Sequence, residues 1–192
     1  MVDRAVEGPN QNYLTPEQQI PSKPLPYPWE SCMTMANSWS YVPNDQYKST
    51  AKILENLCLI VSRGGNYLLN IAPNAQGEWD PIAYQRLEEV GAWMNINGAA
   101  IYGTHPIAPY EVKTEQGTWV FTENVQKELF AIFIPVDFEV MFVEFPANQL
   151  NISGKKELTT LGSTTHYKLK KSAANVLVYD RKGLPQVWKI SK

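Results

Sequence analysis

The fold of this 192-residue chain is decided by the stretch Ser49-Thr-Ala-Lys-Ile-Leu-Glu-Asn-Leu-Cys-Leu-Ile-Val-Ser62, which is followed by Gly64-Gly-Asn-Tyr-Leu-Leu-Asn-Ile71. The first part carries apolar residues at helical spacing, so it predicts a helix with Ser49 as N-cap and the glycines as its stop. The second part is a short apolar run between glycines and a proline-containing turn. Such a run is typical of a buried strand.

A second helix is expected directly after this strand. Asp80 is a good N-cap, Pro81 suits the first helical position, and the helical spacing continues to Asn97-Gly98. Helix, strand and helix in this order are the pattern of a parallel α/β sheet. Before them, residues 8–28 contain too many prolines for a helix or a central strand. They predict a long ordered loop that shapes a pocket.

Beyond residue 108 the pattern changes to short runs of β-branched and aromatic residues that are separated by polar breaks. The runs cover residues 118–122, 129–134, 139–145, 165–169, 176–179 and 186–190. Several short strands without intervening helices indicate an antiparallel β-sandwich. We therefore expect an α/β part over residues 1–108 and an all-β part over residues 109–192.

Composition and charge exclude several classes of function. The net charge is −2 and only 19% of the residues are charged, so the chain has neither the basic footprint of a nucleic-acid-binding protein nor a polybasic membrane surface. The longest apolar runs are too short to cross a bilayer. The first residues lack the basic and apolar regions of a signal peptide, so none is expected on this chain.

The residues that most often bind metals are few. Cys32 and Cys58 form neither a disulfide framework nor a metal-binding pattern, and His105 and His166 are too scattered for a zinc site. We interpret all four as structural and expect neither a metal nor a cofactor.

Glu30 is the first candidate for a catalytic residue. It lies in Tyr27-Pro-Trp-Glu-Ser-Cys-Met-Thr-Met-Ala-Asn-Ser-Trp-Ser-Tyr41, among Tyr27, Trp29, Trp39 and Tyr41. A carboxylic acid among aromatic side chains is partly desolvated, which disfavours its charged form and suits it to proton donation. The alternative is that Glu30 caps a helix or forms a surface salt bridge.

Several motifs occur together in one order. They are Pro28-Trp-Glu-Ser-Cys-Met-Thr34, Ser38-Trp-Ser-Tyr41, Gly64-Gly-Asn-Tyr-Leu-Leu-Asn-Ile-Ala-Pro73 and Gly91-Ala-Trp-Met-Asn-Ile-Asn-Gly-Ala-Ala-Ile-Tyr-Gly-Thr104. In this order they resemble the C-terminal part of the family 29 glycoside hydrolases, the α-L-fucosidases. The resemblance is close over residues 1–108 and weaker but collinear beyond. It implies the C-terminal portion of a (β/α)8-like catalytic barrel, followed by an antiparallel β-sandwich.

The resemblance also implies an activity and three site residues. The activity is the retaining hydrolysis of fucosylated glycans, in which one carboxylate attacks the sugar and another protonates the leaving oxygen. By its place in the Trp-Glu motif, Glu30 would be the acid/base. Arg4 matches a residue that reaches the sugar, although an ion pair at a strand end is an equal alternative. Trp39 or Trp29 could stack on the sugar or pack in the core.

The family nucleophile is an aspartate on an earlier barrel strand, which we expect to lie before residue 1. The chain alone is therefore predicted to be inactive, and an incomplete barrel is expected to self-associate through its uncovered edges. By resemblance, the parent enzyme would be secreted, periplasmic or lysosomal. The alternative function is a non-catalytic carbohydrate-binding or barrel-stabilising sandwich module. A carbohydrate-binding module would expose aromatic residues such as Trp119, Phe121 or Trp188 on a sandwich face.

Overall fold

The computed structural model describes residues 8–137, 139–150, 154, 157–170, 175–181 and 183–191. The chain forms two compact units, of which the first ends at Met94 and the second begins at Asn95. This division falls inside helix α2 (Pro81–Asn97), whereas the sequence pattern changes near residue 108. Strand β3 (Thr104–Lys113) crosses residue 108 and pairs with strand β4 of the second unit. Its prolines, Pro106 and Pro109, conceal the strand pattern in the sequence.

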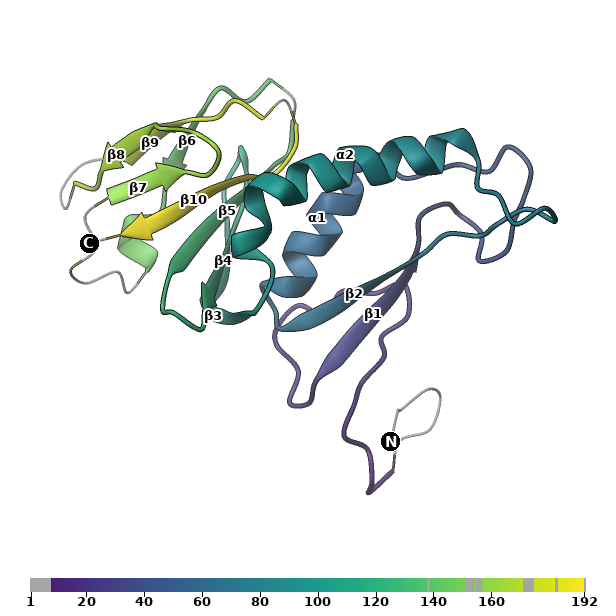
Figure 1. The fold of residues 1–192 in the computed structure, drawn as a ribbon. Coiled ribbons are helices and arrows are strands. Elements are labelled where there is room, and N and C mark those ends of the chain that lie inside the picture. Colours follow the sequence, from purple (N-terminus) through teal and green to yellow (C-terminus); the bar gives the residue numbers. More distant parts are fainter. Residues whose placement is uncertain are drawn as a thin grey trace. The chain divides into compact units, whose positions relative to one another are not determined.

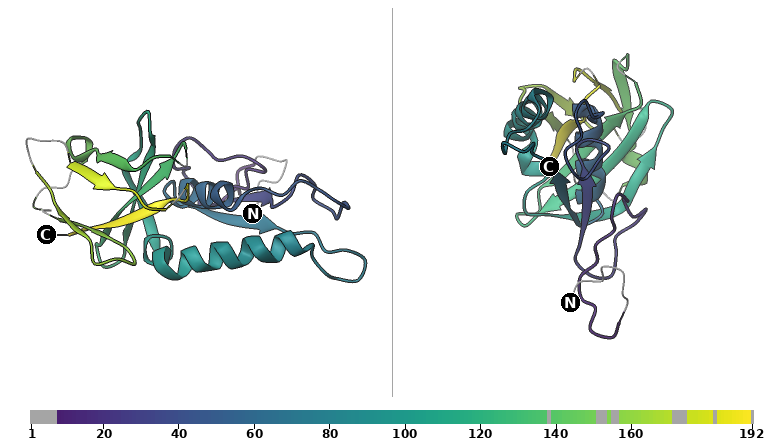
Figure 2. Two further views of the ribbon diagram at one scale, coloured as in Figure 1. Left: turned by 90° about the horizontal axis from the view of Figure 1, so that it is seen from above. Right: turned by 90° about the vertical axis from the view of Figure 1, so that its right-hand side faces the viewer.

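The first unit is built on a parallel strand–helix–strand arrangement (Figures 1 and 2). Strand β1 (Trp29–Thr34) leads through helix α1 (Thr50–Val61) to strand β2 (Gly65–Asn70), and α2 follows. The two strands pair in parallel along their whole lengths. Parallel neighbours need such a crossover connection, so the predicted α/β pattern is confirmed here.

The predicted caps of α1 are present. The Ser49 side chain accepts a hydrogen bond from the backbone N–H of Lys52 at 3.2 Å. At the other end, the N–H of Ser62 donates to the Cys58 carbonyl at 3.0 Å, and Gly64 has a φ of 79°. Glycine adopts this left-handed conformation without the steric cost that other residues incur, which explains why the helix stops here.

The proline-rich loop is ordered against β1. Leu14 and Glu17 form isolated parallel bridges with Trp29 and Cys32. The loop contributes Leu14, Ile20 and Leu25 to an apolar cluster around the buried side chains of Trp29, Met33 and Ile60. The loop therefore forms part of the wall of this unit.

The described residues of the second unit form two antiparallel sheets. The larger has the strand order β3-β4-β5-β10-β7-β8, and the smaller pairs β6 with β9. Beyond β3, the strand bounds are β4 (Gly117–Asn124), β5 (Leu129–Pro135), β6 (Phe142–Phe145), β7 (Glu157–Thr160), β8 (His166–Lys168), β9 (Asn175–Val178) and β10 (Gln186–Ser191). One apolar core takes residues from both sheets, so the predicted sandwich is confirmed.

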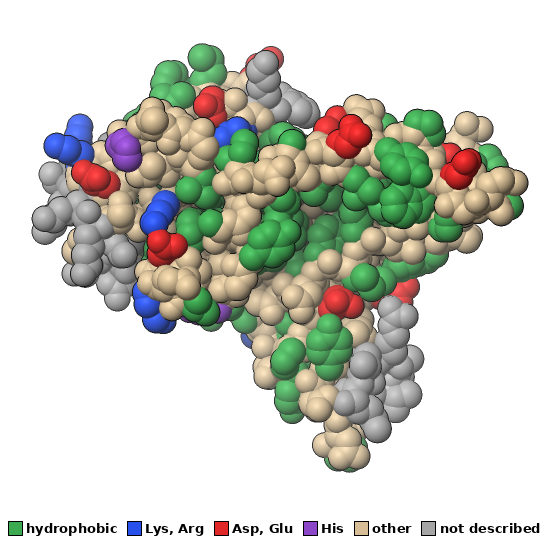
Figure 3. Space-filling view, viewed as in Figure 1, with side chains coloured by type: hydrophobic (Ala, Val, Ile, Leu, Met, Phe, Trp, Pro, Cys, Tyr) green, Lys and Arg blue, Asp and Glu red, His purple; other side chains and the backbone are tan. Residues whose placement is uncertain are grey.

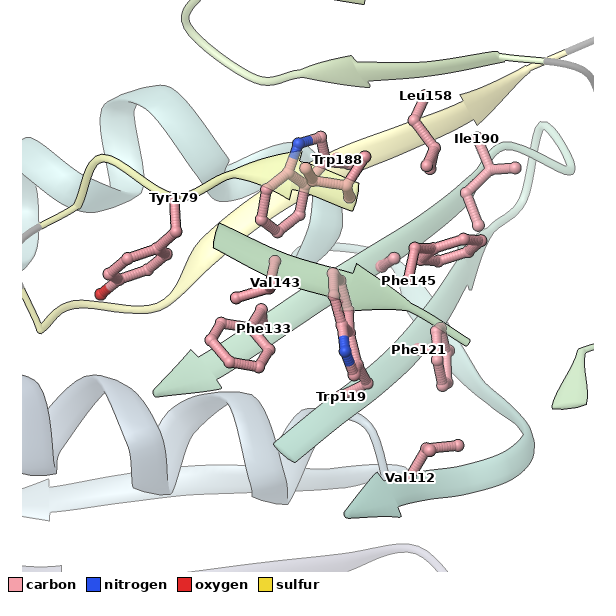
Figure 4. Packing of buried hydrophobic residues seen from close by; sticks show 12 residues of the cluster. Val112, Trp119, Phe121, Phe133, Val143, Phe145, Leu158, Tyr179, Trp188 and Ile190 are labelled. Carbon is pink, nitrogen blue, oxygen red and sulfur yellow. The ribbon is translucent and has the colours of Figure 1, made fainter. Parts of the chain in front are cut away.

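Aromatic side chains dominate the sandwich core (Figure 4). The Trp119 ring centroid lies 5.0 Å from that of Phe133, 5.4 Å from that of Phe145 and 5.3 Å from that of Trp188. Trp119, Phe121 and Trp188 are each 0% exposed. These three residues are therefore core residues, and none of them can serve as an exposed platform for a glycan.

Candidate functional site

Glu30 is the second residue of β1, where both neighbouring chain segments hold its backbone. Its N–H donates to the Leu14 carbonyl at 3.0 Å, and it lies opposite Asn66 in the register with β2. Its side chain is half-buried. Successive residues of a strand point to opposite faces, so Glu30 faces away from the core that receives Trp29.

Trp29 is the buried counterpart of Glu30. It is 1% exposed, and its indole N–H donates to the Arg63 carbonyl at 3.3 Å. A Cβ atom on Gly65 would lie 2.5 Å from the indole ring. Of the two alternatives for Trp29, stacking on a sugar and packing in the core, the structure supports the core.

The other aromatic residues of the Trp-Glu stretch have separate environments. Tyr27 is 45% exposed and Trp39 is 40% exposed. The Tyr41 hydroxyl donates to Asp80 Oδ1 at 3.5 Å, at the start of α2. Tyr27 and Trp39 thus present much of their rings to solvent, and Tyr41 is bonded to the start of α2.

Tyr13, from the proline-rich loop, is electrostatically coupled to Glu30. Burial raises the pKa of Tyr13, the negative charge of Glu30 raises it further, and a hydrogen bond from the Asn66 side chain lowers it. No local sequence pattern indicates this coupling, because Tyr13 and Glu30 are distant in the chain and the parallel pairing of the loop with β1 brings their segments together.

A second polar cluster closes the far end of β1. The Lys48 ammonium donates to the carbonyl oxygens of Thr34 at 2.6 Å and Ala36 at 3.2 Å, and Gln18 Nε2 donates to Thr34 Oγ1 at 3.1 Å. Burial lowers the pKa of Lys48. The lysine provides a hydrogen-bond donor for the carbonyl groups of Thr34, the last residue of β1, and of Ala36 beyond it. We therefore interpret this cluster as structural.

A shallow hollow lies beyond the carboxyl ends of β1 and β2. Its lining residues are Met35, Ala36, Ser38, Ser40, Tyr41, Val42, Asp45, Tyr47, Asn70, Ile71 and Ala72. Asn70 Oδ1 is buried and accepts no hydrogen bond from the described residues. Hydroxyl, amide and carboxylate groups of this kind suit a hydroxyl-rich ligand. Neither Glu30 nor Trp39 lines this hollow.

The remaining candidate residues are Arg4, the two cysteines and the two histidines. Arg4 lies outside the described residues. Cys32 and Cys58 are buried free thiols, and burial raises the pKa of Cys58. His105 Nε2 lies 3.1 Å from Glu123 Oε2, and His166 Nδ1 lies 2.9 Å from the Thr159 hydroxyl. Both histidine contacts are between strands of the sandwich.

On the face shown in Figure 3, acidic and basic side chains are scattered among apolar and neutral ones. Within the described ranges, His, Cys, Asp and Glu side chains do not gather into a group of three that could hold a metal ion. In the same ranges, neither helix is both long enough and apolar enough to cross a membrane.

Comparison with known proteins adds the family. A family model described as Alpha-L-fucosidase matches residues 1–99, which is more than half of the chain. The plasma alpha-L-fucosidase of Rattus norvegicus is 31% identical over 78% of this chain and 33% of its own length. The tissue alpha-L-fucosidase of Mus musculus is 38% identical over 58% of this chain and 26% of its own length. The chain thus spans about a third or less of these curated relatives.

Solved structures share the fold. Alpha-L-fucosidase isoenzyme 1 from Paenibacillus thiaminolyticus matches 94% of this chain and 45% of its own, with a TM-score of 0.76 and 26% identity. The Thermotoga maritima alpha-fucosidase in complex with fucose matches 98% of this chain and 44% of its own, with a TM-score of 0.77 and 25% identity. The expected fold, the C-terminal portion of a (β/α)8-like barrel followed by a β-sandwich, is confirmed. The chain belongs to the α-L-fucosidase family of glycoside hydrolases.

Proposed function

We propose that this chain supplies the proton donor of a retaining α-L-fucosidase and that Glu30 is that donor. The observation that carries the proposal is the position of Glu30 on β1, where its half-buried carboxyl group faces away from the apolar core. The matched family region, residues 1–99, contains the Trp-Glu motif.

The reaction needs a second carboxylate. In retaining hydrolysis, a nucleophile attacks the anomeric carbon while the acid protonates the departing oxygen, and the two carboxyl groups lie about 5 Å apart. The acid then acts as a base and takes a proton from water. The nucleophile would come from the part of the full-length relatives that this chain does not span. We therefore expect the isolated chain to release no fucose.

The proposed substrate is a fucosylated glycan, which the Thermotoga maritima structure in complex with fucose supports. Trp39 and Arg4 are the proposed sugar-binding residues. The exposure of Trp39 leaves an indole face available for stacking on the sugar, as a buried indole would not be. The plasma relatives support a secreted setting for the whole enzyme, with a periplasmic or lysosomal setting as the other choices.

Replacing Glu30 tests this role in an enzyme in which the chain is joined to the rest of the barrel. Glu30→Gln should lower kcat/KM about 10²–10⁴-fold for a fucoside with a poor, alkyl leaving group, because that oxygen must be protonated as it departs. A 4-nitrophenyl leaving group needs little protonation, so the decrease in kcat/KM for a 4-nitrophenyl fucoside should be much smaller.

The matched control is Glu17→Gln, which changes an exposed carboxylate of the adjacent loop segment and should leave both rates unchanged. Equal losses for good and poor leaving groups in Glu30→Gln would refute the role of Glu30 as the acid. Fucose release by the isolated chain would refute the need for a nucleophile from elsewhere.

A further inference from the structure

Three side chains from three adjacent chain segments lie on one face of the β1–β2 pair. Glu30 and Asn66 are partners in the parallel register, so their side chains point to the same side. Leu14 forms a parallel bridge with Trp29 and packs on the same cluster, so Tyr13, one residue earlier, lies on the same face as Glu30. The segment is fixed there by the N–H of Leu14, which donates to the Pro28 carbonyl at 3.0 Å, and by the Leu14 carbonyl, which accepts from Glu30.

We propose that Tyr13, oriented by Asn66, is a positioning residue that holds the Glu30 carboxyl group for proton transfer. This inference rests on the proposed function, and it assigns roles to two residues outside the Trp-Glu motif.

The three groups differ in whether they donate or accept hydrogen bonds. A hydrogen bond from the Asn66 side chain lowers the pKa of Tyr13, so Asn66 acts as the donor. The phenolic hydrogen then remains available to Glu30, which acts on Tyr13 through its charge. A phenol can donate to a carboxylate and can also accept from a carboxylic acid. Tyr13 can therefore form a hydrogen bond with Glu30 in both protonation states of the carboxyl group. The proposed role of Glu30, first as acid and then as base, requires both states.

The electrostatics of Tyr13 agree with this arrangement. Among the described residues, Glu30 is the charged group that raises the pKa of Tyr13, in addition to the larger effect of burial. The hydrogen bond from Asn66 acts in the opposite direction, because it stabilises the phenolate.

The first test uses the chain by itself and follows the titration of the Tyr13 phenol by the NMR signal of its Cζ carbon. Glu30→Gln removes the neighbouring charge and should lower the pKa of Tyr13. Asn66→Ala removes the donor to the phenolate and should raise it. Glu17→Gln should leave it unchanged. If neither Glu30→Gln nor Asn66→Ala changed the pKa of Tyr13, the proposed interaction among these three residues would be overturned.

The second test uses the joined enzyme. Tyr13→Phe keeps the ring and deletes the hydroxyl group, and it should lower kcat/KM roughly tenfold for an alkyl leaving group and less for a 4-nitrophenyl one. It should also displace the pH profile of kcat/KM. In a variant that already carries Glu30→Gln, adding Tyr13→Phe should lower kcat/KM little further, because the hydroxyl group then has no acid to position.

The two proposals fail separately. If Glu30→Gln has no selective effect on poor leaving groups, the proposed function fails, whatever the NMR titrations give. If Glu30→Gln behaves as an acid variant while Tyr13→Phe shows wild-type rates and an unchanged pH profile, only the positioning role is overturned. Asn66→Ala provides a second kinetic variant in case Tyr13→Phe lowers the yield of folded enzyme.

Discussion

Trp29 and Glu30 are consecutive residues with opposite environments, and the strand that carries them explains why. A strand alternates its side chains between two faces, so the indole enters the core while the carboxyl group faces the loop and β2. The motif thus anchors the strand with one residue and presents an acid with the next. This arrangement predicts different consequences for the tryptophans of the stretch.

Trp39→Ala and Trp29→Ala form a matched pair. Trp29 is fully enclosed, so its truncation should lower the free energy of unfolding by about 3–5 kcal/mol. Trp39 is 40% exposed, so its truncation should change stability by no more than about 0.5 kcal/mol. In the joined enzyme, Trp39→Ala should instead raise KM for the fucoside. Urea unfolding and steady-state kinetics measure the two effects, and an unchanged KM would remove Trp39 from the sugar site.

Replacing Lys48 tests the polar cluster at the end of β1. Lys48→Met keeps the length of the side chain but leaves the carbonyl groups of Thr34 and Ala36 without this donor. The expected loss of stability is about 1–3 kcal/mol by urea unfolding. Lys52→Met, which removes an exposed pair with Glu55, should cost less than about 1 kcal/mol. Similar losses for both lysines would mean that the cluster contributes no more than a surface ion pair.

At this scale the Trp-Glu motif made Glu30 the candidate acid, but the motif does not show which residues of other segments act on it. Of the aromatic residues around it in the sequence, Trp29 is buried in the core, Tyr27 is exposed and Tyr41 reaches Asp80. Tyr13 is electrostatically coupled to Glu30 because two segments pair in parallel. No local pattern in the sequence encodes such a pairing.

At the scale of the elements, helices were predicted better than strands. Ser49 and Pro81 mark helix starts by local chemistry, and both helices begin where those residues predict. Strand β3 was missed because of its prolines, and the four-residue β7 because it is too short to show alternation. The run at 139–145 forms a strand only from Phe142, since pairing with β9 begins there.

Two glycines of the first unit should respond in opposite ways to alanine. A Cβ on Gly65 would overlap the Trp29 ring, so Gly65→Ala should destabilise the chain by about 1–3 kcal/mol. Gly91 lies inside α2 with nothing within 4 Å of its added Cβ, so Gly91→Ala should stabilise it by roughly 0.5–1 kcal/mol. Thermal unfolding followed by circular dichroism measures both. Stabilisation by Gly65→Ala would contradict the close packing at β2.

The β3–β4 pair carries a pH-dependent contact. A hydrogen bond from Lys127 lowers the pKa of Glu123 below its ordinary value of 4.5, with further attraction from Lys127 and His105 and an opposing effect of burial. Because the folded-state pKa is lowered, this stabilisation is present above about pH 4.5 and is lost as the pH falls through the folded-state value.

Glu123→Gln should therefore lower Tm at pH 7 and have progressively less effect towards pH 3. Glu115→Gln changes an exposed carboxylate in the turn between the same two strands and should show no such trend. A Tm difference that stays constant from pH 7 to pH 3 would show that Glu123 acts through packing instead of charge.

At the scale of the whole chain, the two units differ in how completely their sheets are paired. Strand β5 has a hydrogen-bonded neighbour on each side, β4 and β10, whereas β2 pairs only with β1 among the described residues. A pair of strands without further neighbours is marginally stable in water. The motifs identified the family, but the compact units, which divide at Met94 and Asn95, depend on contacts that no motif shows.

Hydrogen exchange should reveal this difference. Backbone amides of β5 should exchange much more slowly than those of β2, because opening β5 breaks two ladders and the aromatic core. Mass spectrometry of peptides covering 65–70 and 129–135 makes the comparison. Equal protection would show that the first unit is as stable as the sandwich, and sedimentation at two concentrations would then report whether the expected self-association is the cause.

The parallel bridges of the proline-rich loop limit how this region can vary in length. Leu14 and Glu17 are each matched to one residue of β1, and Ser31 Oγ donates to the Gln19 carbonyl at 2.6 Å. One residue gained or lost between positions 14 and 17 would break this match and turn later side chains to the opposite face. Insertions and deletions should therefore accumulate among residues 21–24, between the packed side chains of Ile20 and Leu25, where a change of length leaves the register of Leu14 and Glu17 with β1 intact.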